Sequence, residues 1–176
     1  MKYLDKITLG GGCFWCLEAI FNRLNGVVLV RSGYSGGQLE NPTWEQVCSG
    51  ESAHAEVCEI QFDSSIISLD SLLEVFWEVH DPTTLNRQGY DVGTQYRSVV
   101  FCENNQQLHC AILSKNLANT NSSRPIVTEV SLRTNFYFAG EFHHSYFETN
   151  KNQAYCQFVV SPKLTKLIAQ FPKYLK

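Results

Sequence analysis

The pattern of apolar and polar positions predicts short strands separated by amphipathic helices. It is clearest over residues 6–24, KITLGGGCFWCLEAIFNRL. The apolar run 7–9 predicts a strand, and the three glycines that follow it predict a tight turn. Between Leu17 and Leu24 the apolar residues recur at i, i+3, i+4 and i+7, which predicts a helix. Cys13 therefore lies at the first turn of this helix.

The rest of the chain continues this alternation. Further strands are predicted over residues 27–34, 54–62, 98–102 and 126–132, the last with an aromatic extension over 135–139. Further helices are predicted over residues 44–50, 68–80, 103–118, 141–150 and 163–173. This order predicts an α/β (α+β) fold, a two-layer sandwich in which helices flank a central mixed sheet. We expect a single domain over residues 1–176, in which residues 151–176 form an extended C-terminal tail.

One charged residue interrupts an apolar strand face. In the strand 54–62, Glu56 lies on the same side as Ile60 and Phe62, because alternate residues of a strand point to the same face. Burial of an ionised carboxylate is costly, and it would raise the pKa of Glu56. Alternatively, Glu56 is a salt-bridged or strand-end residue at the edge of the sheet. The pattern leaves both interpretations open.

A long polar segment follows the helix predicted over 68–80. Residues 80–96, HDPTTLNRQGYDVGTQY, show no hydrophobic periodicity and contain a proline and two glycines. Loops of this length inside a compact domain are usually functional. We therefore expect a long catalytic loop here.

Composition narrows the class of protein. The 176 residues are 44% hydrophobic, which is enough for one ordinary core. The net charge of −3 gives no electrostatic reason to expect nucleic acid or an anionic membrane as a partner. No stretch approaches the 18 apolar residues of a membrane span, and the N-terminus has no signal-peptide pattern. We expect a soluble, cytoplasmic monomer.

The seven cysteines are Cys13, Cys16, Cys48, Cys58, Cys102, Cys110 and Cys156. An odd number without a secretion signal favours catalytic, redox or merely buried thiols over a disulfide framework. At a helix start, unpaired N–H groups and the helix dipole favour the thiolate, so we expect a lowered pKa for Cys13. The preceding glycines would let another molecule approach the backbone closely.

Three interpretations of Cys13 follow from its neighbours. With Cys16 it forms a C-x-x-C, which is typical of a redox dithiol, although Phe14 and Trp15 between them look more like a substrate pocket than a spacer. An ordinary buried thiol fits poorly with three preceding glycines. A zinc site would need a second ligand pair, and the sequence has no second C-x-x-C or H-x3–5-H, so we expect no metal.

Several segments together resemble the A-type peptide methionine sulfoxide reductases. The shared motifs are GCFWC at 12–16, NPTWEQVCSG at 41–50, AHAEV at 53–57, HDPTT at 80–84, NRQGYDVGTQYRS at 86–98 and FYFAGEFHHSYF at 136–147. They follow the family's order and spacing. The resemblance implies a two-layer α/β sandwich that reduces methionine-S-sulfoxide, free or in proteins, without a cofactor.

The resemblance also implies roles for the reacting groups. Cys13 matches the nucleophile that attacks the sulfoxide sulfur, and Glu56 matches the acid that protonates the oxygen. Tyr96 matches a phenol that also binds this oxygen. A glutamate on an apolar strand face and a cysteine at a helix start would have their pKa values moved in opposite directions, which provides acid and nucleophile at one pH.

Substrate contacts are implied in the same way. Phe14 and Trp15 match the walls that hold the methyl group, and Asp91 matches a residue that binds the substrate's backbone amine or amide. Trp44 stands where relatives usually carry a tyrosine that helps to hold the sulfoxide oxygen. An indole N–H can donate one hydrogen bond but cannot accept one, so this oxygen site is altered.

A sulfenic acid on Cys13 would need a second, resolving thiol. The resemblance points to Cys156 on a flexible C-terminal segment, with thioredoxin reducing a Cys13–Cys156 disulfide. Cys16 is the alternative, although two cysteines three residues apart in a helix face geometric strain. Two other functions remain possible on the residues alone: a thiol–disulfide oxidoreductase that uses Cys13 and Cys16, and a non-catalytic binding module with an aromatic pocket.

Overall fold

The computed structural model describes residues 3–176, so residues 1–2 of the predicted domain lie outside the described part. Its main sheet has six strands: β1 (Leu4–Gly10), β2 (Val27–Ser35), β3 (Ala55–Asp63), β6 (Val99–Cys102), β7 (Glu129–Leu132) and β8 (Tyr137–Phe138). Their order across the sheet is β7-β6-β1-β3-β2-β8. All neighbours are antiparallel except β6 and β7, which are parallel. The predicted mixed sheet is confirmed.

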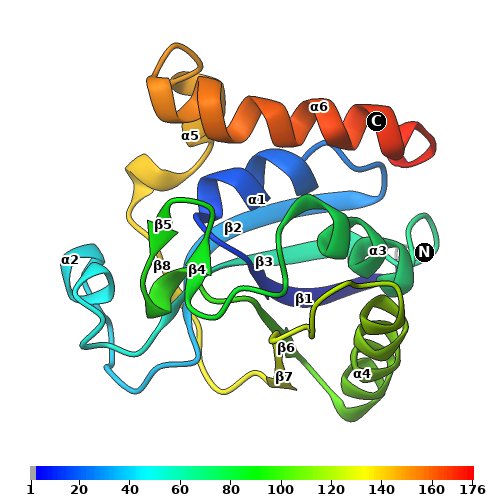
Figure 1. Ribbon diagram of the computed structural model, residues 1–176, viewed down its shortest axis with the longest axis horizontal. Coiled ribbons are helices and arrows are strands. Elements are labelled where there is room, and N and C mark those ends of the chain that lie inside the picture. The colour runs from blue at the N-terminus through cyan, green and yellow to red at the C-terminus, as the bar shows by residue number, and fades with distance from the viewer. Residues whose placement is uncertain (1–2) are drawn as a thin grey trace.

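The helices are α1 (Phe14–Phe21), α2 (Trp44–Cys48), α3 (Leu69–Val79), α4 (Asn105–Thr120), α5 (Tyr146–Thr149) and α6 (Ser161–Gln170). Four short helical turns join them: η1 (Thr94–Tyr96), η2 (Glu141–His143), the π-helical η3 (Cys156–Val160) and η4 (Pro172–Tyr174). Figure 1 shows α6 lying across α1 on the same side of the sheet. Within residues 3–176, no helix combines the length and apolar character needed to cross a bilayer.

Strand β3 shows how the sequence divides the two faces of the sheet. Cys58, Ile60 and Phe62 are fully buried in the main core, which α1, α3 and α6 share. Ala55 and Val57 point to the opposite face, where they belong to a smaller apolar cluster. The predicted alternation of this strand is confirmed, and the two-layer α/β sandwich with it.

The aromatic segment 135–139 differs from its prediction. It does not extend the preceding strand, because the chain crosses from β7 at one edge of the sheet to β8 at the other edge. There Phe138 pairs with Gly33 of β2. The side chain of Asn135 anchors the crossing, accepting from the Gly36 N–H and donating to the Gly37 carbonyl.

The C-terminal segment is folded where an extended tail was expected. Turn η3 leads directly into α6, and both pack against α1. Cys156, Val160, Leu164 and Leu167 are buried in the main core. These four residues recur at near-helical spacing, which explains why the segment forms a continuous helical arm rather than a free tail.

Candidate active site

Cys13 lies between β1 and α1 as the N-cap residue of the helix, with φ −63° and ψ 130°. The glycines before it make room for other parts of the chain. Gly12 has a φ of +88°, and a Cβ there would lie 2.7 Å from Cγ of Gln88. A Cβ on Gly11 would lie 2.8 Å from Cδ2 of His80. The close approach of the long loop therefore requires these glycines.

The electrostatic environment of Cys13 is opposite to the one predicted. The residue is only 8% exposed. Burial, followed by the charges of Glu56 and Cys16, raises the pKa of the Cys13 thiol well above its ordinary value. One N–H of the helix start, that of Phe14, donates to Oε2 of Glu56 at 3.2 Å instead of to the thiol. The cost of desolvating a thiolate thus outweighs the helix N-terminus.

Glu56 is a buried carboxyl on an interior strand, so the sheet-edge interpretation is wrong. It is 2% exposed, and β3 lies between β1 and β2. Burial raises the pKa of Glu56 to about 7, and the negative charge of Asp91 acts in the same direction. The Phe14 N–H and hydrogen bonds with Cys13 and Trp44 oppose this shift. A substantial share of the Glu56 carboxyls is therefore protonated at neutral pH.

Aromatic rings form the wall beside Cys13. Trp15 stacks on Tyr146 with a centroid distance of 3.7 Å and an interplanar angle of 5°. The indole N–H of Trp15 donates to Nδ1 of His143 at 3.2 Å. The Phe14 ring meets His143 edge-on at 5.0 Å. Burial lowers the pKa of His143 to about 4, so this histidine is a neutral part of the wall at physiological pH.

The long loop 80–96 is folded rather than structureless. It contains a hairpin of β4 (Arg87–Gln88) and β5 (Asp91–Val92), followed by η1. In the hairpin Asp91 pairs directly with Gln88, whose side chain packs against Gly12. The Gly12 N–H donates to the Tyr96 carbonyl at 3.2 Å. The loop is thereby joined to the turn that carries Cys13.

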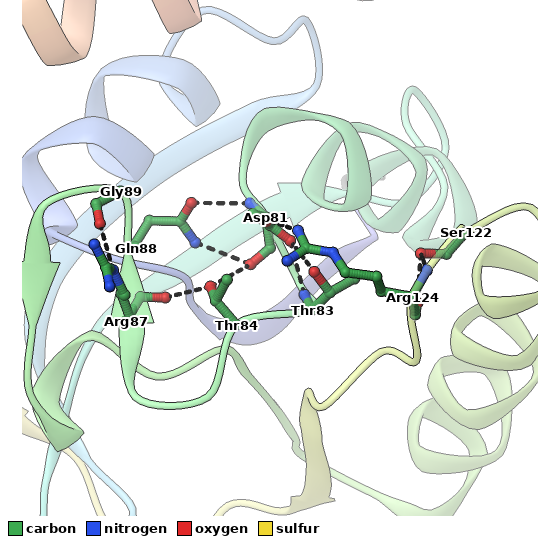
Figure 2. Close-up of polar contacts among 8 residues, drawn as sticks. All are labelled: Asp81, Thr83, Thr84, Arg87, Gln88, Gly89, Ser122 and Arg124. Atoms are coloured by element: carbon green, nitrogen blue, oxygen red, sulfur yellow. Dashed lines mark hydrogen bonds and ion pairs between the residues drawn. The ribbon is translucent and has the colours of Figure 1, made fainter.

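Figure 2 shows the polar contacts that hold this hairpin. The Gln88 amide accepts from the Asp81 N–H at 2.9 Å and donates to the Asp81 carbonyl at 3.1 Å. The Thr84 hydroxyl donates to the Arg87 carbonyl at 2.6 Å. Arg124 donates to the Asp81 carboxylate at 2.8 Å. Hydrogen bonds from side chains thus hold this loop in place, because its two short strands share few backbone hydrogen bonds.

Asp91 is engaged by a residue that was not predicted. The hydroxyl of Tyr155 donates to Oδ2 of Asp91 at 2.7 Å, and the Tyr155 ring meets Trp15 edge-on at 5.8 Å. Tyr96 faces the same group of residues. Burial, followed by the charges of Glu56, Cys13 and Asp91, raises its pKa, so its phenol stays protonated.

Trp44 begins α2, whose N-cap Thr43 accepts from the Gln46 N–H. Trp44 is 42% exposed, and its side chain lies close enough to the Glu56 carboxyl to lower the pKa of that carboxyl. The structure therefore brings Trp44 to the acid, at the rim of the site.

The candidate resolving thiols are both buried. Cys156 is 0% exposed at the start of η3, so it does not lie on a free tail. Cys16 is also 0% exposed, and its N–H donates to the Cys13 carbonyl at 3.1 Å. Cys16 interacts electrostatically with both Cys13 and Cys156. The objection of helix strain also weakens, because Cys13 precedes the helix as its N-cap.

The structure thus brings Cys13, Phe14, Trp15, Trp44, Glu56, Asp91 and Tyr96 to one site, with Cys16 and Cys156 beneath it. Sequence reasoning missed Tyr34, His143, Tyr146 and Tyr155. The one signal for the last three was the density of aromatic residues around 136–155. Among the described residues, no three His, Cys, Asp or Glu side chains converge as metal ligands would.

The fold and the site define an α/β enzyme in which a cysteine and a carboxylic acid lie beside a cluster of aromatic rings. The sequence model of the peptide methionine sulfoxide reductase family matches residues 5–174, and the chain belongs to this family of oxidoreductases.

Individual relatives agree over nearly the whole chain. The peptide methionine sulfoxide reductase MsrA of Trichodesmium erythraeum is 50% identical over 171 residues, 96% of this chain and 97% of that protein. MsrA of Saccharolobus solfataricus is 47% identical over 173 residues, 98% of each chain.

The fold is also similar to solved structures of Mxr1 from Saccharomyces cerevisiae. The reduced form gives a TM-score of 0.81 at 32% identity and covers 87% of this chain and 89% of that one. Mxr1 in complex with Trx2 gives a TM-score of 0.58 at 25% identity, covering 78% and 82%.

Proposed function

We propose that this enzyme reduces the S epimer of methionine sulfoxide, free or in proteins, by attack of Cys13 on the sulfoxide sulfur. The observation that carries the proposal is the buried Glu56 carboxyl, with a pKa of about 7, which accepts from the N–H of Phe14, the residue next to Cys13. The A-type motifs support the choice of epimer.

The two groups complete a balanced reaction. A sulfoxide oxygen leaves poorly until it is protonated, and the neutral Glu56 provides this proton while the Cys13 sulfur bonds to the sulfoxide sulfur. The thiol proton of Cys13 returns to the Glu56 carboxylate. The oxygen then moves to the Cys13 sulfur: the methionine S–O bond and the bond between the two sulfurs break while a new S–O bond forms on Cys13. Cys13 is thereby oxidised by two electrons to a sulfenic acid, and methionine leaves reduced by two electrons. The raised pKa of the Cys13 thiol fits a nucleophile that loses its proton only within the complex.

The pocket supports one substrate orientation. Phe14 and Trp15 hold the methyl group against apolar surface, and Asp91 receives the backbone amine or amide. Tyr96 and Trp44 lie toward the oxygen, where each offers one donor. The substrate is thereby fixed at both ends with its sulfur over Cys13.

Cys16 resolves the Cys13 sulfenic acid, and Cys156 then attacks the disulfide that this forms. Condensation of the Cys13 sulfenic acid with the Cys16 thiol forms their disulfide and releases water. Attack of the Cys156 thiol on the Cys16 sulfur forms a Cys16–Cys156 disulfide and frees Cys13 as a thiol. The burial of Cys156 and its interaction with Cys16 support this order over a direct Cys13–Cys156 bond.

A dithiol reductant then reduces the last disulfide. Thioredoxin fits this role, since Mxr1 was solved with Trx2 and such a dithiol becomes a disulfide as it restores Cys16 and Cys156. We further propose that the enzyme acts as a cytoplasmic monomer.

Single turnovers without added reductant test the chemistry. The fully reduced enzyme is mixed with a peptide that contains methionine-S-sulfoxide, and the methionine formed per enzyme is measured. The relay frees Cys13 for a second attack, so we expect about two methionines from the wild type and none from Cys13→Ser. A wild type that forms no methionine would refute the proposed function, as would equal reduction of the R epimer.

Variants of the thiols test the order of resolution. Cys16→Ser and Cys156→Ser should each form about one methionine, the first accumulating sulfenic acid and the second a Cys13–Cys16 disulfide. Cys110→Ser is the matched control, because this half-buried thiol lies on α4, away from the site. Peptide mapping under non-reducing conditions identifies the disulfides. A Cys13–Cys156 bond in the wild type, with one methionine formed, would replace the relay by direct resolution.

A further inference from the structure

None of the contacts described above involves the buried hydroxyl of Tyr34. Tyr34 lies on β2, its side chain is 2% exposed, and its hydroxyl oxygen is buried without a hydrogen-bond partner among residues 3–176. Buried polar atoms are almost always paired, because an unpaired one loses its bonds to water without replacement. A phenylalanine would provide the same ring without this cost. The hydroxyl itself therefore needs an explanation.

The position of Tyr34 places it beside the acid. In the antiparallel pair of β2 and β3, Tyr34 lies directly opposite Glu56, and opposite residues of a sheet point to the same face. The Tyr34 ring also lies 5.8 Å from the ring of Phe14. Two strands and the start of α1 thus direct the phenol toward the space around the Glu56 carboxyl.

The charge around the hydroxyl makes it a permanent donor. Burial, followed by the charges of Glu56, Cys48, Glu45 and Cys13, raises the pKa of Tyr34. The phenol thus keeps its proton throughout the physiological range. What the hydroxyl lacks is an acceptor, and a bound sulfoxide brings a strongly accepting oxygen into this space.

We propose that Tyr34 is a further catalytic residue, whose O–H donates a hydrogen bond to the oxygen of the bound sulfoxide beside Glu56. This rests on the proposed function and extends it. The orphan donor is held ready for charge that develops as the S–O bond breaks, and it needs no rearrangement of the protein at that moment. The folded enzyme thus carries an unsatisfied group that the substrate satisfies.

The test compares Tyr34 with a second residue whose buried hydroxyl also lacks a hydrogen-bond partner among the described residues. Thr8 on β1 also has a buried hydroxyl without a partner, but it lies opposite Phe101 and Glu59, outside the site. Tyr34→Phe and Thr8→Val should both leave the melting temperature unchanged or raise it, since each removes an unpaired buried group. Only Tyr34→Phe should slow the first turnover, by about 10- to 100-fold. Thr8→Val should stay within about twofold of the wild type.

A binding measurement tests the role of Tyr34 independently of whether the enzyme reduces the sulfoxide. In a Cys13→Ser background, which cannot turn over, tryptophan fluorescence follows binding of a methionine-S-sulfoxide peptide and of the same peptide with methionine. Tyr34→Phe should weaken binding of the sulfoxide peptide alone. Equal loss for both peptides, an unchanged first turnover, or a lowered melting temperature with normal binding would each overturn the role of Tyr34. Failure of the wild type to reduce the sulfoxide, with oxygen-dependent binding intact, would refute only the proposed function.

Discussion

Burial decides the behaviour of both reacting side chains. At Glu56, desolvation raises the pKa of the carboxyl to about 7. At Cys13, the same effect raises the pKa of the thiol, although the helix start acts in the other direction. A neutral carboxyl is thus available near neutral pH, while the thiol keeps its proton. In the proposed reaction, this arrangement favours protonation of the sulfoxide oxygen over a permanently reactive thiolate.

This tuning predicts how the first turnover depends on pH. Glu56 is protonated below pH 7 and ionised above it, so the wild-type rate of methionine formation should fall as pH rises through about 7. Glu56→Gln cannot release a proton and should be slower by about 10²- to 10⁴-fold, without this pH dependence. Rapid-quench measurements between about pH 6 and 8 check both statements. A wild-type rate that is constant over this range would exclude Glu56 as the acid.

Residues whose role follows from local pattern could be predicted, and those that depend on tertiary contacts could not. The helix-start position of Cys13 and the inward face of Glu56 follow from periodicity within one element. The raised pKa of the Cys13 thiol depends on everything packed around it. The bond from Tyr155 to Asp91 joins residues 64 positions apart, and no spacing in the sequence signals it.

At the scale of elements, the β4–β5 hairpin is held by side chains more than by its own strands. Each strand has two residues, too short for a periodic signal, which is why the sequence predicted a loop here. Gln88 joins the hairpin to the backbone of Asp81 through two hydrogen bonds. The position of Asp91, the partner of Gln88 in the hairpin, therefore depends on one amide side chain.

Removal of this amide should affect binding more than chemistry. Gln88→Ala loses both bonds to Asp81, so we expect a KM for a sulfoxide peptide about 5- to 10-fold higher and a first-turnover rate within about threefold of the wild type. Arg124→Ala is the control, because it breaks an ion pair of Asp81 whose Arg124 side chain is 60% exposed, and such pairs contribute little. Steady-state kinetics distinguish the two. A reduced rate with an unchanged KM would contradict this role of the hairpin.

At the scale of the whole molecule, the sequence predicted the layers of helices and strands more accurately than it predicted how the strands are connected. The strand and helix order identified the sandwich, but periodicity cannot say which edge of a sheet a strand joins, so β8 was misplaced. Similarly, residues 151–176 were expected to form a tail with a helix over 163–173. The packing of the whole segment against α1 was not expected, because periodicity does not show which surface a helix contacts. The C-terminal arm completes the main core, with Leu164 and Leu167 beneath its surface.

The packed arm should be visible in hydrogen exchange. Because Cys156, Val160 and Leu167 are fully buried, amides of η3 and α6 should exchange at least about 10³-fold more slowly than those of an unfolded chain. The exposed hairpin 87–92 should exchange much faster and provides an internal comparison. Deuterium uptake by peptic peptides of the reduced enzyme measures both. Exchange of η3 and α6 as fast as the hairpin would indicate a mobile tail instead.

The hydrogen bond from Tyr155 to Asp91 gives the enzyme a competitor within its own chain. A ligand that needs the Oδ2 acceptor position now used by Tyr155 must displace this phenol, so its apparent affinity is its intrinsic affinity multiplied by the fraction of molecules in which Tyr155 has moved away. Tyr155 directly precedes Cys156 in the chain, so such a ligand also displaces the residue before this buried thiol. A ligand contact at Asp91 and the packing of Cys156 are thereby linked through one short segment.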